Sequence, residues 1–278
     1  MFRFYRIVAL VSLISFVVPA AGCSGRNFDA SYELEKGATY RAVPTLYASF
    51  DAYDSTNHII QGGCFDGKYF YVAMFASDAV DSRVIITKFD KDFNVVKNSK
   101  PLDLDHANNI AYNSRENVLV VSHCQSNDED RYSRYSKLDP KTLKIKESGD
   151  LEHPFFSMGY SADLDKYGSG EWAGEKIDVW DGEMKLEKTF AVDTPPTLSQ
   201  GVCCNRDYIW FVRSSKNGYS CELRLYNWET GELEFQIPID NMTVEPESIN
   251  IVDGTIYIIA NNESYNGGYV YTLELVKQ

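Results

Sequence analysis

Four polar side chains occupy the same position of a pattern that recurs along the chain: Gln61, Asn108, Gln200 and Glu247. Amide and carboxylate groups can hydrogen-bond a hydroxyl-rich ligand or hold a cation. Alternatively, such side chains satisfy backbone groups or line a water-filled channel. We expect them to form a polar ring at one end of a channel, with Ser157 or Met158 as the fifth member.

Two histidines lie close to this set. His106 begins His106-Ala107-Asn108-Asn109, and His123 ends the strand that follows. Histidine can ligate a metal or transfer protons, but neither residue lies in a recognised metal spacing, so we expect no metal there. Arg213 and Asn261 end equivalent strands in later repeats. The candidate ligand-binding residues are therefore Gln61, His106, Asn108, Asn109, His123, Gln200, Arg213, Glu247 and Asn261.

Each remaining candidate has a second interpretation. Arg213 is a cation that could hold a carboxylate or phosphate, or it forms a surface ion pair. The acidic loop 125–132 has carboxylates two residues apart, yet it lacks the glycine and final glutamate of a calcium-binding hand. A solvated loop is favoured, with a structural cation such as calcium as the alternative. No catalytic residue can be assigned from the sequence.

The elements that carry these residues repeat. An alternating apolar run, an aromatic residue or leucine, and an acid or amide recur with turns at positions 90, 139, 181, 227 and 274. Spacings of 42–49 residues are typical of a four-stranded propeller blade. Alternation with a period of two indicates half-buried strands. We predict an all-β, five-bladed β-propeller; six blades is the alternative, for which there are too few turn signals.

The ends of the pattern predict how the ring closes. The last repeat stops after its third strand, whereas residues 39–50 form a spare alternating segment before the first repeat. We expect this N-terminal strand to complete the last blade, which would leave no open edge between the first and last blades.

The N-terminus has the features of an export signal. Arg3 and Arg6 precede an apolar core that is too short for a membrane span, and small residues follow. Ala20-Ala21-Gly22-Cys23-Ser24 resembles a bacterial lipobox, although Ala20 replaces the usual leucine. We expect residues 1–22 to be a signal peptide, Cys23 to be lipidated, residues 23–38 to be a tether and residues 39–278 to be the propeller. Secretion without a lipid is the alternative.

The charge and the cysteines limit the partners and the cross-links. A net charge of −13 disfavours nucleic acid and anionic lipid, so a membrane would be reached only through the lipid anchor. Five cysteines follow Cys23, namely Cys64, Cys124, Cys203, Cys204 and Cys221. Cys203 or Cys204 could form a disulfide with Cys221 across a predicted hairpin; otherwise these are small buried side chains.

Short motifs resemble a bacterial group. Gln-Gly at two strand starts, His106-Ala107-Asn108-Asn109 and Tyr112-Asn113 are similar to secreted propellers, some of them called teichoic acid biosynthesis protein C. The resemblance implies an envelope-associated propeller with no established reaction. Gln-Gly also resembles five-bladed glutamine cyclotransferases, but their other motifs are not evident and their activity is not expected.

Together these features predict an exported, monomeric, non-catalytic module that binds a cell-envelope saccharide, polymer or protein. One alternative is an envelope hydrolase or lyase that uses His106 with Glu247 as acid and base. The other is a scaffold within a larger assembly.

Overall fold

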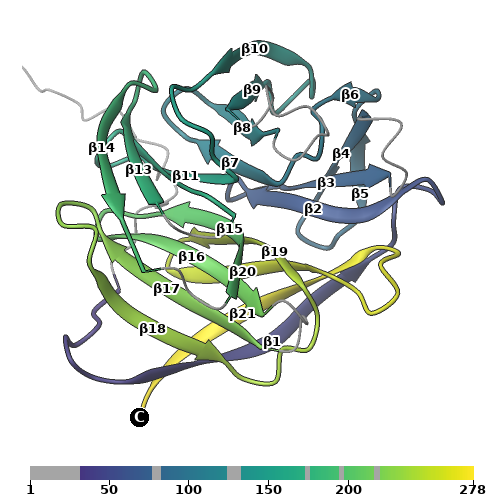
Figure 1. The fold of residues 1–278 in the computed structure, drawn as a ribbon. Helices are drawn as coiled ribbons and strands as arrows, with labels where there is room; N and C mark the ends of the chain where they lie inside the picture. Colours follow the sequence, from purple (N-terminus) through teal and green to yellow (C-terminus); the bar gives the residue numbers. More distant parts are fainter. Residues whose placement is uncertain (1–31, 77–82, 124–132, 173–175, 194–196, 216–219) are drawn as a thin grey trace, which may run out of the picture.

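The chain is built from strands that group into four-stranded antiparallel units (Figure 1). The structure, a computed structural model, describes residues 32–76, 83–123, 133–172, 176–193, 197–215 and 220–278. No helix occurs among them, so the predicted all-β, propeller-type fold is confirmed. The expected signal peptide, Cys23, Cys124 and loop 125–132 lie outside the described residues. Within the described ranges no helix is long and apolar enough to cross a membrane.

The strand pairings define five such units. The first three are β2 (Asn57–Phe65), β3 (Phe70–Ala76), β4 (Arg83–Phe89) and β5 (Val95–Asn98); β7 (Asn109–Asn113), β8 (Val118–Ser122), β9 (Arg134–Leu138) and β10 (Ile145–Asp150); and β11 (Ser157–Ser161), β12 (Lys166–Gly170), β13 (Lys176–Asp181) and β14 (Leu186–Ala191). The last two are β15 (Thr197–Cys204), β16 (Tyr208–Ser215), β17 (Cys221–Asn227) and β18 (Leu233–Ile239); and β19 (Pro246–Val252), β20 (Thr255–Asn261), β21 (Gly268–Lys277) and β1 (Tyr40–Phe50). The short β6 (Leu102–Asp103) pairs with β4. Within the described part of the chain the pairings give no sixth unit.

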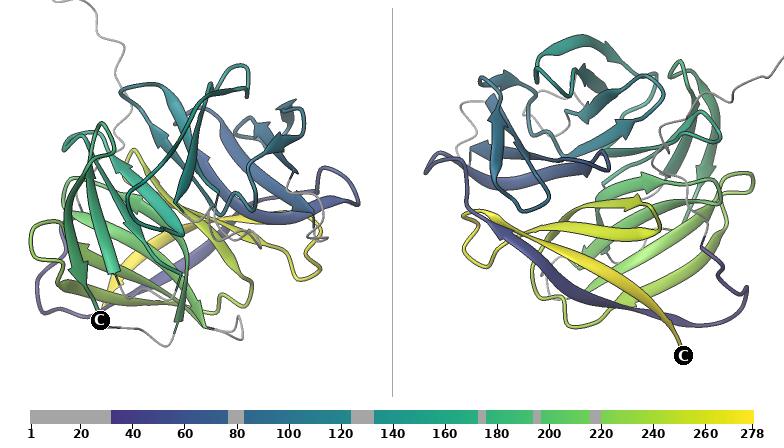
Figure 2. Two further views of the ribbon diagram at one scale, coloured as in Figure 1. Left: turned by 45° about the horizontal axis from the view of Figure 1, so that its top comes forward. Right: turned by 180° about the vertical axis from the view of Figure 1, so that it is seen from behind.

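The first strand of each unit lies at the centre of the molecule. The inner strands β2, β7, β11, β15 and β19 each contact the next, and β19 contacts β2 in turn. They therefore surround a common axis, and the remaining strands of each unit extend outward from it (Figures 1 and 2).

The N-terminal strand closes this ring, as the sequence predicts. β1 pairs antiparallel with β21 from Tyr40 opposite Lys277 to Phe50 opposite Gly268 (Figure 2). It also pairs in parallel with β18, where Ala42 lies opposite Ile239. β1 thus joins the fourth and fifth units into one eight-stranded sheet and covers two edges that would otherwise be open.

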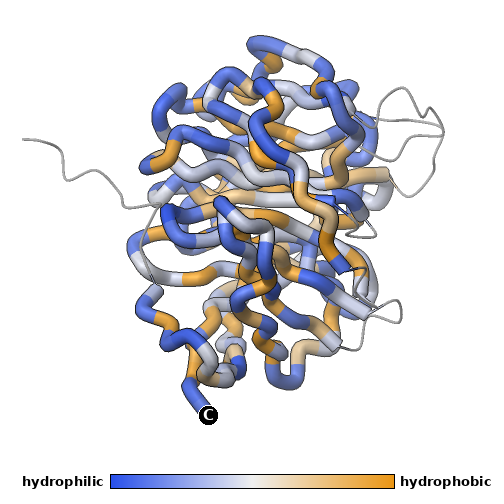
Figure 3. Tube along the Cα trace, turned by 60° about the vertical axis from the view of Figure 1, so that its left-hand side comes forward, coloured by the Kyte–Doolittle hydropathy of each residue, from blue (hydrophilic) through white to orange (hydrophobic). Residues whose placement is uncertain are grey.

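The repeated acid or amide of the sequence forms a side-chain-capped turn after the third strand of the first four units. The carboxylate of Asp90 accepts hydrogen bonds from the backbone N–H of Asp92 and Asn94, and Asp139 does the same for Lys141 and Thr142. Such capping satisfies backbone groups that the tight turn leaves without a strand partner. The predicted turn at position 274 is wrong, because Glu274 lies inside β21 opposite Val43 of β1. In Figure 3 hydrophilic turns separate strands of alternating hydropathy.

The expected disulfide is not formed, because the cysteines lie at different levels of their sheet. Cys203 on β15 is opposite Trp210 of β16, whereas Cys221 on β17 is opposite Ser214, near the other end of β16. No disulfide joins Cys64, Cys203, Cys204 and Cys221 to one another. The alternative interpretation, small side chains within the structure, fits three of them, because only Cys203 is partly exposed.

Candidate functional site

The recurring polar position is a β-bulge in three of the five units. The register shifts by one residue at Gln61 in β2, at Gln200 in β15 and at Glu247 in β19. A bulge adds one residue to a strand and turns its side chain away from the regular alternation. The three residues are therefore structurally equivalent, and they lie at the end of the channel where the inner strands begin.

The glycine after two of these bulges is needed for close packing of neighbouring inner strands. A Cβ atom at Gly62 would lie 2.8 Å from the Cα of Asn109, and one at Gly201 would lie 2.7 Å from the Cα of Ser248. No side chain fits at such distances from a backbone. The Gln-Gly motif thus combines a bulge with a contact to the next unit.

The fifth member of the ring differs from the prediction. Ser157 pairs with Gly170 at the start of β11 just as Asn109 pairs with Ser122 at the start of β7. The residue equivalent to Asn108 is therefore Phe156, and the assignment of Ser157 or Met158 was one or two residues too late. The ring has four polar members and one aromatic member.

Contacts between successive inner strands bring this ring together. The side chain of Asn261 exchanges two hydrogen bonds with the backbone of Ile60, which joins the fifth unit to the first. The remaining junctions are Gly62 against Asn109, Asn109 Nδ2 to the carbonyl of Met158 at 2.7 Å, Ser157 Oγ with Ser199 Oγ at 3.3 Å, and Gln200 Nε2 to Glu245 Oε1 at 2.8 Å. We call this end of the channel the mouth.

Glu247 is a buried acid within the mouth. It is 5% exposed, and one carboxyl oxygen accepts a hydrogen bond of 2.6 Å from Asn261 Nδ2. Burial, together with the charge of nearby Glu245, raises the pKa of Glu247 well above its usual value. Its other oxygen makes no hydrogen bond within the described residues. Glu247 can therefore present a neutral carboxyl group.

Asn108 also has an unused polar group. It is 2% exposed, its Oδ1 lies 2.6 Å from His106 Nδ1, and its Nδ2 has no partner in the described part of the chain. Burial lowers the pKa of His106, whose ring packs edge-on against Phe75. Gln61 is partly exposed, and no hydrogen bond of its amide is found among the described residues. Asn108 Nδ2 and the amide of Gln61 thus have no partner among the described residues, and Gln61 is the more accessible of the two.

Asn109 limits how deep a ligand can enter. Its Nδ2 donates to the carbonyls of Met158 on β11 and Val202 on β15, so its side chain reaches across the axis. The residue is 1% exposed. Asn109 therefore closes the channel below the mouth.

Two other candidates lie at the level of the mouth: His123 follows Ser122, which is opposite Asn109, and Arg213 is opposite Ser199. His123 is buried, and its Nε2 lies 2.8 Å from Ser136 Oγ. Arg213 is buried as well, its guanidinium donates to the side chain and carbonyl of Thr197, and burial lowers its pKa to about 10. The alternative of a surface ion pair for Arg213 is wrong, because the residue is 1% exposed, whereas a ligand-binding role for His123 and Arg213 stays a prediction.

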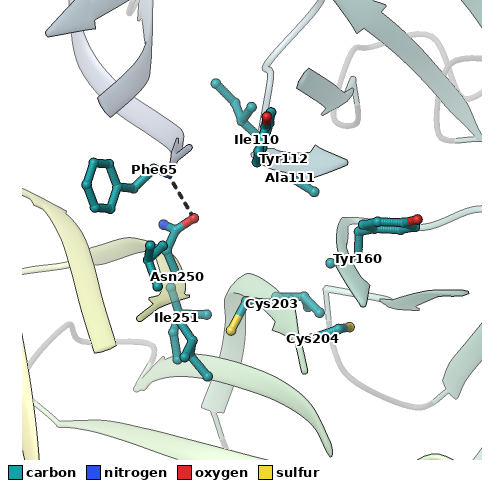
Figure 4. A pocket seen from close by; sticks show the side chains of 13 residues that line it. Phe65, Ile110, Ala111, Tyr112, Tyr160, Cys203, Cys204, Asn250 and Ile251 are labelled. Atoms are coloured by element: carbon teal, nitrogen blue, oxygen red, sulfur yellow. Dashed lines mark hydrogen bonds between the residues drawn. The ribbon is translucent and has the colours of Figure 1, made fainter. Parts of the chain in front are cut away.

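The opposite end of the channel holds a small cavity. Residues of all five inner strands line it, among them Phe65, Tyr112, Tyr160, Cys203 and Asn250 (Figure 4). Its volume of about 30 Å³ has room for about two water molecules. A saccharide unit would not fit within this cavity.

Sequence reasoning missed several residues at the mouth. Tyr265 is 43% exposed and donates a hydrogen bond of 3.1 Å to Glu245 Oε2. Trp172 is 47% exposed, and its ring lies 6.4 Å from that of Phe156. Trp172 lies two residues after the end of β12, the second strand of its unit. Asn261 is the last residue of β20, the second strand of the fifth unit. Comparing strand ends across the repeats could have found Trp172.

Comparisons with known proteins support the fold alone. The sequence matches no protein-family model and no curated protein. Among solved structures 984 chains match, and a fold so widely shared does not select a function. One is a chain of the crystal structure of a nidogen/laminin complex, a β-propeller-type structure with a TM-score of 0.51 and 10% identity, covering 79% of this chain and 85% of that one.

Proposed function

We propose that this chain is an exported, envelope-associated binding module that takes a saccharide, envelope polymer or protein at the mouth of its propeller. The observation that carries the proposal is the set of unused polar groups there, namely Asn108 Nδ2, the amide of Gln61 and the second carboxyl oxygen of Glu247. Unpaired polar atoms in a buried setting are costly, and a hydroxyl-rich ligand would pair them.

Export and anchoring belong to the same proposal. The charged start, apolar core and small residues of residues 1–22 support secretion, and Cys23 would carry the lipid. The short motifs similar to secreted bacterial propellers point the same way. Mass spectrometry of the chain purified from membranes should show lipid on Cys23, and Cys23→Ser should release the protein into the soluble fraction.

Binding at the mouth is tested with variants of one residue type. Gln61 lies at the mouth, whereas Gln236 is exposed on the outer strand β18. We expect Gln61→Ala to weaken retention on envelope fractions by about fivefold, the loss of about one hydrogen bond. Gln236→Ala should leave retention unchanged. Equal retention by both variants and the unchanged protein would refute the site.

A second function is favoured by one observation. The raised pKa of Glu247 is the property that a general acid requires at neutral pH. His106 is its proposed partner. In the structure His106 bonds Asn108, and Glu247 bonds Asn261. An envelope hydrolase or lyase would release product from envelope polysaccharide, and Glu247→Gln would abolish release while binding persists. Binding without product in the unchanged protein would exclude it.

A further inference from the structure

The mouth has one aromatic side among its polar residues. Phe156 stands where the other four units have Gln61, Asn108, Gln200 and Glu247, and Trp172 extends this side outward, 6.4 Å from Phe156 between ring centroids. We call Phe156 and Trp172 the aromatic wall.

The wall is held in place by backbone hydrogen bonds from the ring itself. The N–H of Ser199, on the inner strand of the next unit, donates to the carbonyl of Trp172 at 3.0 Å. The N–H of Phe156 donates to the carbonyl of Gly170 at 2.8 Å. Trp172 is therefore fixed at the mouth between the third and fourth units, although its side chain is 47% exposed.

Saccharide rings match this arrangement. A pyranose has a face of C–H groups that packs on an indole ring and an edge of hydroxyls that needs hydrogen-bond partners. Trp172 supplies the first contact, and the unused groups of Gln61, Asn108 and Glu247 supply the second.

Charge selects among saccharides. The protein carries a net charge of −13, and Glu245 lies at the mouth with the neutral hydrogen-bond donors Gln200 and Tyr265. Burial has turned Arg213 toward Thr197. Among the described residues no cation is bonded to Glu245, so an anionic polymer would meet like charge there.

From these observations we infer that the mouth binds a neutral saccharide whose ring stacks on Trp172. This inference rests on the proposed binding function and makes it more specific, because it replaces the wider class of envelope ligands with uncharged sugars. It assigns to Trp172 the role of contact residue.

Trp172 can be observed by itself. Of the four tryptophans, Trp180, Trp210 and Trp228 are at most 5% exposed, so acrylamide should quench mainly Trp172. The probes are cellotetraose, chitotetraose and mannotetraose, with tetragalacturonate as the anionic counterpart. We expect at least one neutral probe to protect Trp172 from quenching and tetragalacturonate to give no protection.

Variants complete the test by calorimetric titration of the protecting probe. Trp172→Ala should weaken binding by about tenfold or more, whereas Trp172→Phe should keep most of it. Leu233→Ala, an exposed apolar residue on the outer strand β18, is the matched control and should change nothing. Because Trp172 is exposed, its substitution should leave the melting temperature unchanged. An unchanged melting temperature will show that each variant is folded.

The outcomes separate the inference from the function on which it rests. Binding that Gln61→Ala weakens but Trp172→Ala leaves unchanged would overturn the stacking role and keep the mouth as the site. Tight binding of tetragalacturonate would overturn the selection for neutral sugars. Failure of every neutral probe to protect Trp172 would overturn the inference, whereas retention on envelope fractions tests the broader function independently.

Discussion

Replacing Gly201 by alanine should destabilise the ring of inner strands. The new Cβ would lie 2.7 Å from the Cα of Ser248 and 3.3 Å from both the carbonyl oxygen of Glu247 and the N of Ile249. All three atoms belong to the backbone of the neighbouring inner strand, so no side-chain rotation relieves the contact. Either the strands separate or the bulge at Glu247 shifts.

The size of the effect follows from two opposing terms. Overpacking costs about 1–3 kcal/mol, and alanine recovers about 0.4–1 kcal/mol by restricting the unfolded chain. Taken at the middle of both ranges, the net loss is about 1.3 kcal/mol, which for a domain of this size lowers Tm by roughly 3–5 °C. Because Glu247 borders the contact, ligand binding at the mouth should weaken as well.

Gly182→Ala is the matched control. There the new Cβ would approach the carboxylate of Asp165 at 2.6 Å, but that side chain is half exposed and can move aside. Its free energy of unfolding should change by no more than about 0.5 kcal/mol. Urea unfolding and thermal melting followed by circular dichroism measure both variants. If Gly201→Ala is as stable as Gly182→Ala, the close-packing explanation of the Gln-Gly motif is wrong.

Three further predictions concern the seam, the buried acid and the thiols. Deleting residues 1–50 removes β1 and exposes the edges of β18 and β21, so the truncated chain should aggregate during refolding, as light scattering would show; a monodisperse product would contradict this role of β1. Since the folded pKa of Glu247 is raised, the folded state binds more protons than the unfolded state above about pH 4.5, and stability should fall as pH rises from there. Glu247→Gln should reduce that slope in urea midpoints measured between pH 5 and 8, and an identical slope would count against the shift. With a thiol reagent the partly exposed Cys203 should react before Cys64, Cys204 and Cys221, because burial also raises the pKa of Cys64 and raises that of Cys221 to about 12; a native protein in which Cys221 reacts first would contradict the packing.

The propeller-type fold could be predicted because its signals are local. Capped turns at Asp90 and Asp139 and the alternation around them depend on neighbouring residues, so they are visible in the sequence. The role of residues 39–50 followed from counting strands. Alternation shows which face of the sheet a side chain lies on, but not its position along the strand. The predicted Cys203–Cys221 disulfide was wrong for this reason.

The site was predicted only in part for a related reason. Gln61, Gln200 and Glu247 were found because a bulge repeats with them. Phe156 was missed since it breaks the polar pattern, and Trp172 because the ends of the second strands were not compared in the third unit. The burial of Arg213 depends on Thr197, whose position opposite the end of β16 is set by a register shift at Gln200. No sequence pattern displays that shift.

The pairing of Tyr40 with Lys277 has a consequence for biogenesis. β1 is synthesised early and cannot pair with β21 until almost 240 further residues have been synthesised. Contacts of such separation make folding slow. The ring of five units therefore cannot close until the chain is nearly complete.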